Sequence, residues 1–81
     1  MRRDRSVTSD RMVLRVLAIA RTYDKGPYMP DDIAFLSRLS EFTVSKLLTR
    51  LRKAGYVSNV PGGWVITDAG AAKEIFLREV K

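Results

Sequence analysis

The sequence predicts one α+β domain in which three helices are followed by a β-hairpin and a last helix. Three observations support this: a helical period over residues 41–54, a short connection before it, and two β-prone segments around a Pro-Gly-Gly turn. The chain has 81 residues, enough for one compact domain. We expect a domain over residues 9–81 and a flexible basic arm over residues 1–8.

The first two predicted helices span residues 10–23 and 30–39. The first has only a narrow polar strip, so it should be buried on more than one side. The second begins at Pro30 with Asp31 and Asp32 in its first turn, where the helix dipole favours carboxylates. Its expected inward residues are Ile33, Leu36 and Leu39. Only residues 38–40 remain as a connection, which predicts a sharp helix-turn-helix.

The third predicted helix, residues 41–54, has well-defined ends and one apolar stripe. Ser40 is a good N-cap, and Gly55 is a good residue to follow the C-cap. The stripe repeats at helical spacing and consists of Val44, Leu47, Leu48 and Leu51. The opposite face carries Phe42, Lys46, Thr49 and Lys53, with Ser45 and Arg50 beside them. Residues 38–53 hold five cations and one anion of a chain whose net charge is +6.

A basic outer helix face has two interpretations. Lysine and arginine there are often only a solvated surface, and cations late in a helix also suit its dipole. The same face can instead contact nucleic acid. The neighbouring segments favour the second interpretation.

The predicted hairpin joins residues 56–60 to residues 64–67 through Pro61, Gly62 and Gly63. Trp64 and Ile66 should face the core. The last helix should begin after a Thr67 N-cap and cover residues 68–80.

In this order the segments resemble the winged helix-turn-helix domains of MarR-like and PadR-like transcription regulators. The resemblance covers residues from about 10 to the end. The matching residues are Ile33-Ala34-x-Leu36, Leu39-Ser40, Thr43-Val44-Ser45-Lys46-Leu47-Leu48, Leu51-Arg52-Lys53-Ala54-Gly55-Tyr56-Val57 and Trp64-x-Ile66-Thr67-x-x-Gly70. The resemblance implies that helix 41–54 enters the DNA major groove and that the hairpin, or wing, lies along the backbone or minor groove.

Candidate contacts follow from this resemblance and from side-chain chemistry. Phosphates or guanine edges are expected for Lys46, Arg50, Arg52 and Lys53, and base edges or phosphate for Ser45 and Thr49. Phe42 should contact a thymine methyl or a sugar, or else fold back onto Phe35. The full DNA-binding set is Arg38, Phe42, Thr43, Ser45, Lys46, Thr49, Arg50, Arg52 and Lys53. Arg2, Arg3 and Arg5 form the basic arm, which either reaches a minor groove or stays solvated.

The chain departs from the family pattern at three places. Arg38 stands where many such proteins have glycine, so a non-glycine residue is expected at positive φ. Met29 lacks the oxygen of a Ser or Thr cap. The hairpin segment 58–63 contains no Lys or Arg, so the wing should contribute less than the family resemblance implies.

Composition argues against several functions. The chain has no Cys and no His, which excludes disulfides and Cys/His metal sites and removes the usual general bases and thiol nucleophiles. We expect no enzyme activity, cofactor or metal. No signal peptide is visible, and the apolar run of residues 12–20 is too short for a bilayer, so a cytoplasmic protein is expected.

The last helix suggests a partner. Ile75, Phe76 and Leu77 span about 200° of its surface, more than one contact face needs. We expect a twofold homodimer through the first and last helices, although simple exposure of one residue is the alternative.

The predicted function is sequence-specific binding of double-stranded DNA by a small dimeric transcription regulator. The alternatives are a non-specific architectural DNA-coating protein and a winged-helix protein–protein adaptor.

Overall fold

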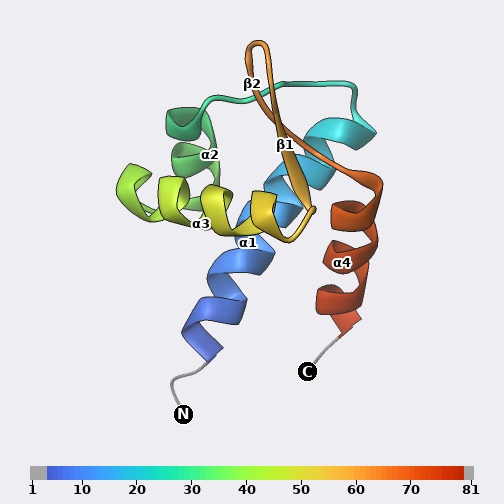
Figure 1. Ribbon diagram of the computed structural model, residues 1–81. Helices are drawn as coiled ribbons and strands as arrows, with labels where there is room; N and C mark the ends of the chain where they lie inside the picture. The colour runs from blue at the N-terminus through green and yellow to red at the C-terminus, as the bar shows by residue number, and fades with distance from the viewer. Residues whose placement is uncertain (1–3, 80–81) are drawn as a thin grey trace.

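The computed structural model describes residues 4–79, in which four helices and one two-stranded antiparallel hairpin form an α+β fold (Figure 1). In chain order the elements are α1 (Asp4–Thr22), α2 (Pro30–Ser37), α3 (Glu41–Lys53), β1 (Val57–Val60), β2 (Gly63–Ile66) and α4 (Asp68–Glu79). α1 packs against each of the other helices and against β2. The order agrees with the sequence prediction and is compatible with a winged helix-turn-helix.

The N-terminal end of α1 differs from the prediction. The helix begins at Asp4 rather than Asp10, because no Pro or Gly interrupts the segment between them. Residues 4–8, which were assigned to the flexible arm, therefore have helical backbone. Arg2 and Arg3 lie outside the described residues, so a minor-groove contact from them stays a prediction.

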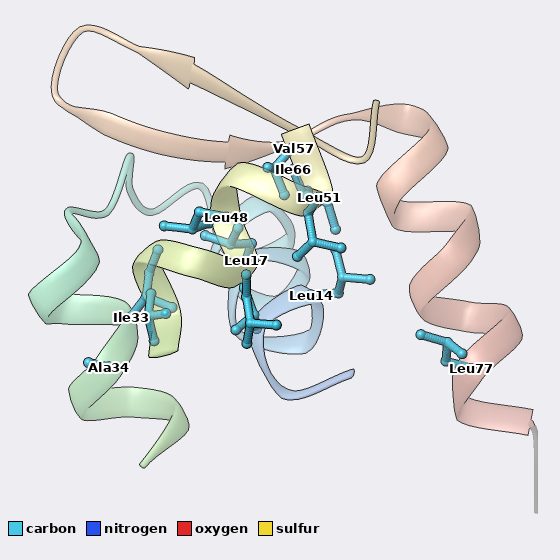
Figure 2. Close-up of a cluster of buried hydrophobic side chains, with 12 residues drawn as sticks. Leu14, Leu17, Ile33, Ala34, Leu48, Leu51, Val57, Ile66 and Leu77 are labelled. Atoms are coloured by element: carbon cyan, nitrogen blue, oxygen red, sulfur yellow. The ribbon is translucent and has the colours of Figure 1, made fainter. Parts of the chain in front are cut away.

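The hydrophobic core forms where the inner faces of α1, α2 and α3 meet beneath the hairpin (Figure 2). α1 contributes Val13, Leu14, Leu17 and Ala20, which are all buried. On its other side Ile19 and Tyr23 are exposed. The broad burial expected for α1 is therefore limited to one face, and an apolar outer face is left uncovered.

On α2, Ser37 lies in the inward position that was predicted for Leu36. Leu36 is 50% exposed, whereas Ser37 is only 2% exposed and is buried beside Ile33 and Ala34. The small Ala34 turns toward the core, which rotates Leu36 outward by about 100° relative to that face. The Ser37 hydroxyl, which donates to the Ala34 carbonyl at 3.5 Å, has a hydrogen-bond partner despite its burial. The predicted inward position of Leu36 was wrong.

The hairpin is anchored to the segment before α2. Val57 pairs with Ile66 and Val60 with Gly63, and both Val57 and Ile66 are buried. Trp64 of β2 also forms an antiparallel bridge with Tyr28, which precedes α2, and the two backbone N–H to carbonyl distances are 2.8 and 3.2 Å. A Cβ atom on Gly63 would lie 2.3 Å from the Tyr28 carbonyl oxygen, so only glycine allows this approach.

α4 is fixed to the turn that follows α3. The Gly70 N–H donates to the Thr67 hydroxyl oxygen at 3.0 Å, which confirms the predicted N-cap. The same hydroxyl donates to the Gly55 carbonyl at 2.7 Å, and the Thr67 N–H donates to the Tyr56 carbonyl at 3.0 Å.

Within residues 4–79, no helix combines the length and the apolar character needed to cross a membrane.

Candidate nucleic-acid interface

Two short hydrogen-bonded motifs define the ends of α3. At its start, the Thr43 N–H donates to the Ser40 hydroxyl at 3.1 Å. At its end, the Tyr56 N–H donates to the Leu51 carbonyl at 2.9 Å and the Gly55 N–H to the Arg52 carbonyl at 3.0 Å, which is the Schellman pattern. Gly55 has φ +86° as this pattern requires. Both predicted ends are confirmed.

Arg38 makes the turn between α2 and α3. Its φ of 63° and ψ of 27° place it in the left-handed region, as the family resemblance led us to expect. A non-glycine residue there costs about 1 kcal/mol. The Leu39 N–H donates to the Ala34 carbonyl at 3.2 Å and helps to close the turn. The side chain of Arg38 is exposed, so the residue that makes the sharp turn also presents a cation beside α3.

The side chains of α3 divide into a buried face and an exposed face. The predicted stripe of Val44, Leu47, Leu48 and Leu51 is buried. We call the opposite side the outer face of α3 and define it by Phe42, Lys46, Thr49 and Lys53, all of which are exposed. The other predicted contacts lie at its margins: Thr43 and Arg50 on one side, and Ser45 and Arg52 on the other. Of the nine predicted residues only Thr43 is half-buried, and the other eight are exposed.

An exposed aromatic ring lies beside a cation on the outer face of α3. The Lys46 Nζ atom lies 5.3 Å from the centroid of the Phe42 ring, a cation–π distance. Phe42 is 73% exposed and Phe35 is 83% exposed, so the two rings do not shield each other from solvent. The alternative in which Phe42 folds back onto Phe35 is not observed.

The hydroxyl groups of α3 differ in how much hydrogen-bonding capacity they retain. Thr43 Oγ1 accepts from the Ser40 hydroxyl at 2.9 Å, so this residue takes part in the N-cap. Thr49 Oγ1 donates to the Ser45 carbonyl at 3.1 Å. Because its proton is used within the helix, the Thr49 hydroxyl is best suited to accept a hydrogen bond from a partner such as a base amino group.

Arg50 is exposed, but its guanidinium is ion-paired within the fold. Its guanidinium Nη2 donates to Asp10 Oδ1 of α1 at 2.6 Å. The pair ties the margin of the outer face to the N-terminal half of α1. A contact between Arg50 and DNA would therefore share this guanidinium with Asp10. Sequence reasoning missed Asp10, because the partners are 40 residues apart and no local pattern links them.

The hairpin offers little positive charge. Its loop and strands over residues 58–63 contain no Lys or Arg. The Asn59 side-chain amide donates to the Gly63 carbonyl at 3.1 Å, so this donor stabilises the hairpin itself. Among the described residues, no cluster of three or more His, Cys, Asp or Glu side chains could hold a metal ion. Of the hairpin and α3, only α3 therefore supplies positive charge for binding nucleic acid.

Comparison with known proteins finds no matching family model, no similar curated protein and no similar solved structure.

Proposed function

We propose that this chain is a winged helix-turn-helix protein that binds double-stranded DNA, with α3 as the recognition helix in the major groove. On this proposal it is a small, dimeric, cytoplasmic transcription regulator. The observation that carries the proposal is the outer face of α3, where exposed lysines and hydroxyls lie on a helix held by a tight turn and two hydrogen-bonded ends.

The arrangement of side chains suits different parts of a duplex. Lys46 and Lys53 lie at the centre of the outer face and are suited to phosphates or guanine edges. Thr49 can accept from a base amino group. The exposed ring of Phe42, which has the Lys46 ammonium 5.3 Å from its centroid, can meet a thymine methyl.

Exposed apolar residues favour dimerisation of the same protein. Ile19 of α1, Tyr23 immediately after α1, and Ile75 and Phe76 of α4 are exposed. Binding to a palindromic site would require a twofold dimer, here through α1 and α4, in which the two copies of α3 lie about 34 Å apart, one turn of duplex. Each copy of α3 would then read one half of a palindromic site.

A second candidate function is a protein–protein adaptor. It is favoured by a different set of exposed apolar residues near the helix-turn-helix, namely Met29, Phe35, Leu36 and Phe42. Such side chains bind protein partners as readily as they contact DNA. A non-specific architectural protein that coats DNA would use the same cations on α3 without reading bases.

Selection from a pool of random duplexes tests the proposal. We expect the protein to retain DNA and to enrich a palindrome whose half-sites are separated by about one helical turn. Retention of DNA without an enriched motif would favour the function of a non-specific architectural protein over that of a regulator. No retention of duplex at low salt would contradict DNA binding and leave the adaptor function.

A further inference from the structure

An ion pair joins the margin of the outer face of α3 to α1, and the fold holds one member of the pair more firmly than the other. The Asp10 side chain is 25% exposed, whereas that of Arg50 is 54% exposed. Asp10 lines, together with Leu14 and Leu51, a cavity of about 120 Å³. Because Asp10 lies on a packed side of α1, its carboxylate is a fixed anchor. The longer and more exposed side chain of Arg50 is the group that this anchor positions.

The cation on α4 that lines the same cavity has other contacts. The Nζ atom of Lys73 lies over the rings of Tyr56 and Phe76, at 5.8 and 5.2 Å from their centroids. Both are cation–π distances. Lys73 therefore leaves the Asp10 carboxylate to Arg50, at an Oδ1 to Nη2 distance of 2.6 Å.

Pairing changes which part of a duplex suits Arg50. An isolated guanidinium is attracted by its charge to the closely spaced phosphates of DNA. A carboxylate beside it cancels most of that charge at longer range and itself repels phosphate. Hydrogen bonds to a base edge depend on direction more than on net charge, and arginine commonly donates to guanine O6 and N7 in the major groove. A guanidinium that is already held in place loses less conformational freedom when it forms such bonds.

We propose that Asp10 is a specificity-determining residue, which holds Arg50 for a guanine edge and away from phosphate. This inference rests on the proposed function, because it gives a residue of α1 a role in the DNA interface of α3. The paired Arg50 side chain remains exposed at the margin of the outer face, beside the side that carries Lys46 and Lys53. In this arrangement the lysines supply positive charge, and the Asp10–Arg50 pair supplies a preference for one base.

The binding of two duplexes, measured by fluorescence anisotropy, tests this role. One duplex is the palindrome that selection with the unmodified chain enriches, and the other is a mixed-sequence duplex of the same length. We expect Asp10→Asn to bind the mixed-sequence duplex about fivefold more tightly and the palindrome no more tightly, so the ratio of the two affinities falls about fivefold. On the mixed-sequence duplex, the salt slope should steepen by about 0.9 per protomer, because the released Arg50 contacts one more phosphate.

Two comparisons separate positioning from charge alone. Glu41→Gln removes an exposed carboxylate at the start of α3 that has no ion-pair partner among residues 4–79. It should tighten binding to both duplexes equally and leave their ratio unchanged. In an Arg50→Gln background, Asp10→Asn should no longer change the ratio, because Asp10 acts through Arg50. Each variant should melt within a few degrees of the unmodified chain, because an exposed ion pair contributes little to stability.

The outcomes distinguish this inference from the proposed function. If Asp10→Asn leaves the ratio unchanged, or still changes it in the Arg50→Gln background, Asp10 does not set specificity through Arg50, and DNA binding by α3 stands. Retention of duplex without an enriched palindrome has the same consequence. If the unmodified chain retains no duplex at low salt, the proposed function fails, and the role of Asp10 fails with it.

Discussion

Replacing both central lysines of the outer face of α3 with glutamate, Lys46→Glu with Lys53→Glu, should weaken duplex binding about 100-fold or more at fixed moderate salt. Each protomer loses two phosphate contacts and gains two anions that face the backbone. Both side chains are exposed. Within residues 4–79, their only ring or hydrogen-bond contact is that of Lys46 with Phe42, so the fold should be unaffected. Fluorescence anisotropy with a labelled duplex measures the loss, and circular dichroism confirms the fold.

Two controls locate the effect on α3. Lys25→Glu changes an exposed cation in the loop after α1, and Pro61→Asp adds a negative charge to the exposed loop of the hairpin. Both should reduce affinity only a few-fold, because neither side chain belongs to the outer face of α3. Losses as large as that of the double α3 variant would mean that the DNA interface is misplaced or that the hairpin contributes more than its lack of cations suggests.

Gly70→Ala should destabilise the fold by about 3 kcal/mol, although alanine is the better helix former. A Cβ atom at Gly70 would lie 1.9 Å from the Tyr56 carbonyl oxygen and 2.7 Å from Ile66 Cγ1. The Tyr56 carbonyl also accepts the Thr67 N–H, so it cannot retreat without breaking the start of α4. Thermal unfolding should show a melting temperature lower by about 15 °C.

The matched control for this prediction is Ala69→Gly on the exposed side of the same helix. It should cost only about 1 kcal/mol, the ordinary difference in helix propensity. If Gly70→Ala were instead neutral or stabilising, α4 would not pack as closely on the turn after α3 as described.

Local chemistry made both ends of α3 and the start of α4 predictable. Ser40, Gly55 and Thr67 act through hydrogen bonds within a few residues of the chain, so their roles could be read from the sequence. The positive φ of Arg38 was expected from the family resemblance, in which glycine commonly stands at this turn, and not from the local sequence. The exposed face of α3 followed from its apolar stripe, whose four residues leave only one side for solvent.

Properties that depend on packing between distant segments were not predictable. The outward turn of Leu36 depends on which face of α2 approaches α3, and the spacing of apolar residues did not decide it. The pairing of Arg50 with Asp10 joins α3 to α1, and the roles of Gly63 and Gly70 depend on carbonyl groups in other elements. The early start of α1 was missed because the residues before Asp10 lack the apolar period that marked the rest of the helix.

The salt dependence of duplex binding by the unmodified chain tests most directly whether the cations of α3 contact DNA phosphates. If a dimer neutralises about eight phosphates, the logarithm of the binding constant should fall against the logarithm of salt concentration with a slope of about −7. The double lysine variant should show a distinctly smaller slope, because four of those contacts are removed. A nearly flat response of the unmodified chain would contradict phosphate recognition by α3.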